Sequence, residues 1–127
     1  YERKTQTGKL FKLESKDAER TAYAIIETLQ GMLVHTITYD NGLEFAGHQL
    51  VSETLGACGY FCQPYHSWEK GGVENFNGLV RQYFPKGTNF LNVSEASLAD
   101  IEAELNQRPR KNLGFKSPDN LKHKLAA

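Results

Sequence analysis

Two acidic residues of this chain stand where a fold could bring their carboxylates together. Asp40 ends a run rich in β-branched and aromatic residues and is followed by Asn41 and Gly42, which form turns. Glu74 follows two glycines at the start of a run with helical spacing, and 33 residues lie between the two acids. A fold that joins the end of that strand to the start of that helix therefore makes Asp40 and Glu74 a candidate pair of catalytic residues.

Neighbouring carboxylates repel each other, so a fold keeps such a pair only where a cation, an arginine or a shared proton offsets the charge. Mg²⁺ takes oxygen ligands and is often held by one or two carboxylates together with a substrate phosphate. The pair thus predicts phosphoryl transfer, with Asp40 and Glu74 as metal ligands rather than bases. Taken singly, each acid has another interpretation: Asp40 as a turn former, and Glu74 as a first-turn residue stabilised by the helix dipole.

The composition describes one small domain of 127 residues, in which 15 basic and 15 acidic residues cancel. This balance argues against a protein that coats nucleic acid through bulk charge. From Leu105 onward, however, six basic residues accompany one acid, so this run is either a local phosphate contact or a solvated surface. No apolar stretch approaches the roughly 20 residues of a membrane span. We expect a protein of the cytoplasm, without a membrane partner.

Cys58, Cys62 and His66 recur at intervals of four residues. A structural zinc site usually has four ligands in paired spacing, and no fourth ligand is evident. The sequence therefore does not favour zinc, and two cysteines in a chain of this length fit a reducing compartment.

Periodicity and turn residues predict the order of the elements. We expect a hairpin over residues 1–13, a helix capped by Ser15 that ends near Gly31, and a buried strand over 34–39. A helix over 47–55, with Leu50, Val51, Thr54 and Leu55 inward, precedes a strand over 60–62 and a loop over 63–72. Helices follow over 73–84, from 95 to before Pro109, and from Ser117. This order predicts a mixed α/β domain, a sheet flanked by helices.

Three segments carry a resemblance to a known family. They are Tyr-Asp-Asn-Gly-Leu-Glu-Phe at residues 39–45, Gly-Gly-Val-Glu-Asn-Phe-Asn-Gly-Leu-Val-Arg-Gln-Tyr-Phe-Pro-Lys at 71–86, and Asn-Gln-Arg-Pro-Arg-Lys-Asn-Leu-Gly-Phe-Lys-Ser-Pro at 106–118. Together with Pro64-Tyr65 they resemble the catalytic core of bacterial transposases of the insertion-sequence-thirty family, over nearly the whole chain. An Asp-Asn-Gly turn alone is a weak signal, whereas the run from Glu74 to Lys86 is long and specific.

The resemblance implies a ribonuclease H-like fold with an Asp-Asp-Glu triad that binds two Mg²⁺ or Mn²⁺ ions. Asp40 matches the second acid of the triad and Glu74 the third. Such an enzyme nicks the ends of a mobile element and joins them to target DNA. The implied partners are DNA and further copies of the chain in a synaptic complex, in the bacterial cytoplasm and associated with the nucleoid.

The resemblance also implies residues that contact DNA. Arg81 falls where relatives carry a basic residue, and it shares a helical stripe with Glu74; a surface ion pair is the alternative. Trp68 could stack on a frayed base and His66 could contact phosphate, although packing and solvation explain them too. Lys70 replaces the family's usual arginine. The predicted DNA-contacting residues are Asn41, Asn77, Arg81, Lys86, Arg108, Arg110 and Lys111.

The first acid of the triad is expected on a strand upstream of the opening hairpin. Asp17 cannot replace it, because it begins a helix. We therefore interpret residues 1–127 as the C-terminal portion of the catalytic domain, without its first, central strand, and expect this portion alone to be inactive and poorly stable. Two alternatives remain open: an inactive remnant that acts only in DNA binding or assembly, and a related nuclease that cuts without joining.

Overall fold

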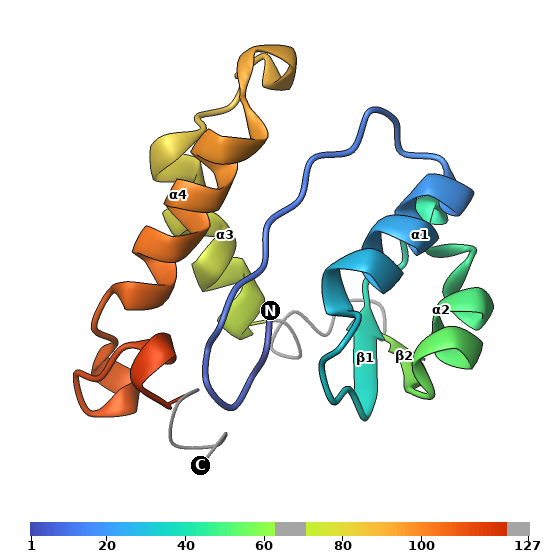
Figure 1. Cartoon of the computed structure of the whole chain (residues 1–127), viewed down its shortest axis with the longest axis horizontal. Coiled ribbons are helices and arrows are strands. Elements are labelled where there is room, and N and C mark those ends of the chain that lie inside the picture. The colour runs from blue at the N-terminus through green and yellow to red at the C-terminus, as the bar shows by residue number, and fades with distance from the viewer. Residues whose placement is uncertain (63–70, 122–127) are drawn as a thin grey trace. The chain divides into compact units, whose positions relative to one another are not determined.

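The computed structural model describes residues 1–62 and 71–121, and the chain forms two compact units. The sheet unit comprises Leu13–Glu69, and the helical unit combines Tyr1–Lys12 with Lys70–Ala127. Figure 1 labels their helices and strands. Each unit is described by itself.

The sheet unit is built on a pair of parallel strands. β1 (Thr36–Tyr39) pairs with β2 (Cys58–Phe61) in a register that sets Thr36 opposite Cys58 and Tyr39 opposite Phe61. The connection between the strands contains the 3₁₀ turn η1 (Leu43–Phe45) and helix α2 (His48–Leu55), as a parallel pair requires. Helix α1 (Ala18–Leu29) packs on η1 and α2 (Figure 1).

The predicted helices and strands of this unit are confirmed, with corrections to their details. Asp17, and not Ser15, caps α1: its carboxylate accepts the Arg20 N–H at 2.8 Å. The strand over 34–39 is expected to be buried, but Tyr39 is the only buried residue of β1. Of the inward positions expected on α2, Val51 is buried, whereas Leu50 and Thr54 are exposed.

The helical unit contains helices α3 (Gly71–Tyr83) and α4 (Glu95–Gln107) and the 3₁₀ turns η3 (Phe90–Asn92) and η4 (Lys111–Leu113). α4 begins at the predicted residue, and Ser94 caps it by accepting the Ser97 N–H at 3.0 Å. The predicted last helix begins at Pro118, where the Ser117 hydroxyl accepts the Asn120 N–H. Leu105 is fully buried.

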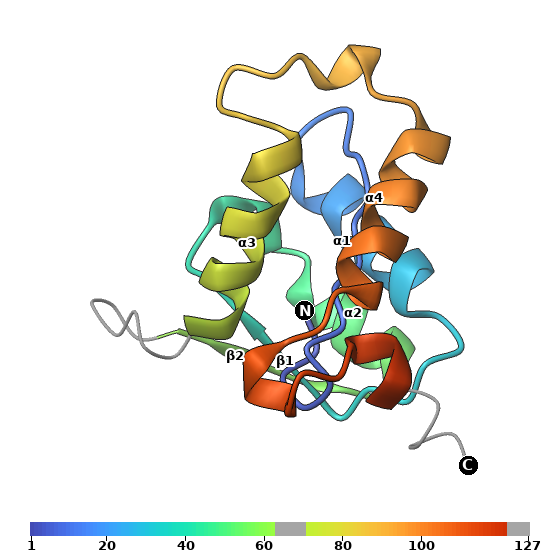
Figure 2. The ribbon, with the colours of Figure 1, turned by 90° about the vertical axis from the view of Figure 1, so that its left-hand side faces the viewer.

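The predicted hairpin over residues 1–13 is wrong, because side chains of α4 bind the backbone of this segment instead of a neighbouring strand. The Asn106 amide accepts the Gly8 N–H and donates to the Gly8 carbonyl, both at 2.9 Å. The Glu102 carboxylate accepts the Leu10 N–H at 2.8 Å. On its other side the segment meets α3, since the Phe76 ring lies directly against Gly8. The segment therefore contacts both helices, and Figure 2 shows it beside α4.

Replacing Asn106 tests this arrangement. Asn106→Ala leaves both buried backbone groups of Gly8 without a partner, and we expect the free energy of unfolding to fall by about 2–4 kcal/mol. Asn106→Asp keeps the acceptor but sets a buried carboxylate against the Gly8 carbonyl, so at neutral pH its loss should be at least as large. Urea unfolding of these variants, with the exposed neighbour Gln107→Ala as control, measures the effect. Equal stability of Asn106→Ala and the control would contradict the assignment.

Candidate functional site

Asp40 stands at the carboxyl end of β1. The residue is half-buried, and its Oδ1 accepts the Gly42 N–H at 2.9 Å, which closes the predicted turn. The carboxyl ends of parallel strands are the usual place for ligand sites in sheets of this class. The turn therefore fixes the direction of the carboxylate at an edge suited to binding.

Asn41 joins the ends of the two strands. Its Nδ2 donates to the Cys62 carbonyl at 2.8 Å, and the Cys62 N–H donates to the Tyr39 carbonyl at 2.9 Å. The Tyr39 ring lies 5.2 Å from the Phe45 ring and 5.4 Å from the Phe61 ring, centroid to centroid. These contacts hold the backbone on both sides of Asp40, so Asn41 ties the backbone next to Asp40 to the end of the second strand.

Glu74 lies in the first turn of α3, where the partial positive charge of the helix end favours an acid. Its side chain is exposed, and so are those of Asn77 and Arg81 on the predicted common stripe. Arg81 also donates to the Phe84 carbonyl at 3.4 Å, near the end of the helix. The polar face of α3 is thus accessible along its length, as the sequence predicts.

The opposite face of α3 is anchored within the helical unit. Buried Phe76 lies 5.7 Å from the Tyr1 ring, centroid to centroid. Gly72 allows this approach, since a Cβ there would lie 2.8 Å from the Tyr1 ring. At the other end of α3, the Tyr83 hydroxyl bonds to the Glu104 carboxylate of α4, which raises the pKa of Tyr83. Glu74 therefore stands on a helix fixed at both ends.

The basic residues predicted to contact DNA differ in exposure. Lys86 and Lys111 are exposed, and Arg108 is half-buried, with its guanidinium 3.5 Å from the Tyr83 hydroxyl. Arg110 is only 7% exposed and donates to the Leu105 carbonyl at 2.7 Å. Burial lowers the pKa of this guanidinium. Arg110 thus serves the end of α4, a structural role that the charge pattern of the sequence does not reveal.

The structure brings the predicted residues together in two sets: Asp40 and Asn41 belong to the sheet unit, and Glu74, Asn77 and Arg81 to the helical unit. Convergence of Asp40 and Glu74 stays a prediction. Within residues 1–62 and 71–121 no three His, Cys, Asp or Glu side chains gather as a metal-ligand group. Cys58 is exposed and Cys62 buried, both as free thiols. The predictions for His66, Trp68 and Lys70 fall outside the described residues.

No described helix has the length and apolar character to cross a membrane.

No family model matches the chain. Among curated proteins, the chain is 48% identical over 110 residues to the transposase for insertion sequence element IS4351 of Bacteroides fragilis, covering 85% of this chain and 34% of that protein. It is 37% identical over 123 residues to transposase InsI for element IS30C of Escherichia coli, covering 94% of this chain and 32% of that protein.

The chain thus spans about a third of the length of the curated relatives it matches. Among solved structures, the catalytic core domain of BIV integrase superposes with a TM-score of 0.68 at 20% identity, covering 98% of this chain and 85% of that one. This likeness confirms the predicted fold class, a ribonuclease H-like α/β domain. The sequence matches confirm the predicted resemblance to insertion-sequence transposases.

Replacing Asn41 with Asp tests its bridging role. The change puts a carboxylate against the Cys62 carbonyl and next to Asp40, and we expect a loss of about 1–3 kcal/mol in unfolding free energy. Repulsion raises the folded pKa of the new carboxylate, so stability is retained below its unfolded pKa and lost as the pH rises through the folded value. The deficit should therefore be larger at about pH 7 than near pH 4.

Chemical unfolding at both pH values measures this deficit. Gln49→Glu introduces the same charge at an exposed position on α2 of the same unit and serves as the matched control. A deficit that matches the control at both pH values would show that Asn41 does not join the strands.

Proposed function

We propose that this chain is part of the catalytic domain of a transposase that cuts and joins DNA. The chain is homologous to about a third of the length of several insertion-sequence transposases. The observation that carries the proposal is 37–48% identity to such proteins over 85–94% of the chain. The fold likeness to an integrase core supports the same class of chemistry at the level of architecture. The proposed partners are DNA and further copies of the chain.

Asp40 and Glu74 are the proposed ligands of a divalent cation. Both offer carboxylate oxygens, the donors that Mg²⁺ and Mn²⁺ prefer, and both stand at element ends held by local contacts. When bound, such ions activate an attacking water or 3′-hydroxyl and stabilise the leaving oxygen. The residues of this chain supply placement: the turn at Gly42 directs Asp40, and the anchored α3 directs Glu74.

The exposed polar face of α3 is the proposed DNA contact beside Glu74. Arg81 and Asn77 lie on the same stripe as Glu74, and Lys86 is exposed beyond the end of the helix. Asn41, Arg108 and Lys111 complete the proposed contacts. A guanidinium and an ammonium hold phosphate oxygens without reading sequence, so these residues would position the DNA backbone.

Neutral replacement of each acid tests the proposed chemistry in the protein translated from the whole reading frame that encodes residues 1–127. Asp40→Asn and Glu74→Gln each remove one ligand charge, and we expect each to lower DNA strand cleavage by at least about a hundredfold. DNA affinity should change little. Cleavage of labelled element ends and equilibrium DNA binding are measured together.

Asp100→Asn and Glu53→Gln, at exposed positions on α4 and α2, are the matched controls and should cleave normally. Cleavage retained by either Asp40→Asn or Glu74→Gln excludes that residue from the site. Joining of a DNA end with a free 3′-hydroxyl to a second duplex separates a transposase from a nuclease that only cuts. DNA binding without cleavage by the unaltered protein is the result expected of an inactive remnant.

A further inference from the structure

The segment after α4 folds back on itself into a fixed loop. In this basic loop, residues 108–116, the Arg110 N–H donates to the Lys116 carbonyl and the Phe115 N–H donates to the Arg110 carbonyl, each at 2.9 Å. Arg110 also ties the loop to α4 through the Leu105 carbonyl. The loop is therefore held in one conformation by backbone hydrogen bonds and one buried side chain.

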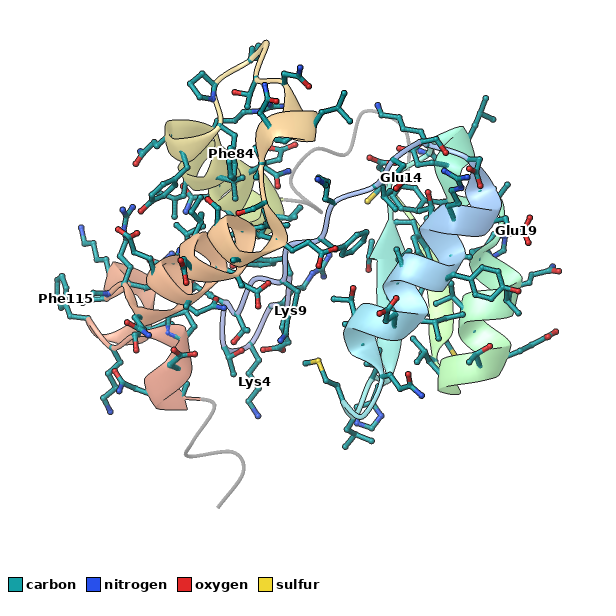
Figure 3. All side chains as sticks on the ribbon, turned by 45° about the horizontal axis from the view of Figure 1, so that its top comes forward. Lys4, Lys9, Glu14, Glu19, Phe84 and Phe115 are labelled. Carbon is teal, nitrogen blue, oxygen red and sulfur yellow. The ribbon has the colours of Figure 1, made fainter. Side chains whose placement is uncertain are left out.

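Phe115 occupies an unfavourable position in this loop. Its φ of 64° is in the left-handed region, directly after Gly114 at the same φ. Glycine adopts this conformation freely, whereas a bulky side chain is strained there. The ring is nevertheless 71% exposed, and Figure 3 shows it projecting outward from the ribbon. Neither the local backbone nor packing explains a phenylalanine at this place.

The surroundings of Phe115 are positively charged. Between Leu105 and Leu121 there are four basic residues and the single acid Asp119. The buried Arg110 makes no ion pair with a described carboxylate, and its Nε has no hydrogen-bond partner among the described residues. A guanidinium charge without a neighbouring acid raises the local potential, so this loop attracts anions. Lys111 is exposed beside it.

We propose that the basic loop binds DNA with unpaired bases, and that Phe115 stacks on one of these bases. Arg108 and Lys111 would contact the phosphates on either side. An aromatic ring provides a stacking surface for any base, and cations nearby bind the backbone, which is the pattern of single-strand recognition. A strained backbone that presents such a ring is typical of a functional position. The inference rests on the proposed function and adds a substrate feature to it, an unpaired stretch at or near a DNA end.

Binding of the protein translated from the whole reading frame to fluorescent oligonucleotides, measured by anisotropy without divalent cations, tests the proposal. The probes are a single-stranded oligonucleotide and the fully paired duplex of the same sequence. Phe115→Ala should weaken single-strand binding about tenfold and duplex binding much less. Phe115→Tyr, which keeps the ring, should restore single-strand binding. Lys111→Ala should weaken both and reduce the salt dependence of both.

Two further variants separate stacking from folding. Phe115→Gly relieves the positive φ, so it should unfold at an equal or higher temperature than the unaltered chain while binding single strands weakly. Leu91→Ala removes an apolar side chain that is 85% exposed, on η3 at the other end of α4, and should change neither affinity.

Unchanged single-strand affinity in Phe115→Gly, or equal losses for single strand and duplex, would overturn the proposal. Either result would leave the metal-ligand assignment of Asp40 and Glu74 intact, because the binding assay contains no divalent cation. Cleavage by Asp40→Asn and Glu74→Gln is measured in a separate assay, so either proposal can fail without the other.

Discussion

The reciprocal hydrogen bonds between Asn106 and Gly8 are the interaction on which the helical unit depends. They bind the N-terminal segment to α4, and the absence of a side chain on Gly8 lets the Phe76 ring of α3 lie against that segment. The segment thus contacts both helices of the unit, α4 through hydrogen bonds and α3 through the Phe76 ring. Glu74 lies two residues before Phe76 on α3. The position of this proposed metal ligand within the unit therefore depends on the contact between Asn106 and Gly8, although Asn106 lies 32 residues after Glu74 in the sequence.

In the sheet unit, fewer contacts are needed to fix Asp40. The Asn41 amide bonds to the carbonyl that follows β2, and aromatic rings pack around Tyr39 at the end of β1. In both units the acid lies at the end of an element. The Asn41 amide holds the backbone beside Asp40, whereas the Asn106 amide holds the segment against which the Phe76 ring of α3 packs. Such support is what a site needs when catalysis consists mainly of placing charged groups. Asn41 and Asn106 are therefore as informative about the site as the acids.

Local signals in the sequence were sufficient for the helices, because Ser94, Ser117 and Gly56 act within a few residues of their own positions. The hairpin over residues 1–13 failed because its backbone partners, Glu102 and Asn106, lie more than 90 residues away. Their spacing of four on the apolar side of α4 was the available signal. The sequence predicts Arg110 as a DNA-contacting surface residue, because composition does not report its burial. The exposed position of Phe115 is not predictable from the sequence, because no local pattern indicates its positive φ.

The central proposal is that Asp40 and Glu74 bind the same divalent cation, and paramagnetic broadening by Mn²⁺ tests it most directly. The ¹⁵N-labelled protein translated from the whole reading frame is titrated with Mn²⁺, and the amide signals around Asp40 and Glu74 are followed. We predict broadening of both groups of signals, and loss of both in Asp40→Asn as well as in Glu74→Gln. Loss of broadening only around the replaced residue, with the other group still broadened, would contradict a shared site.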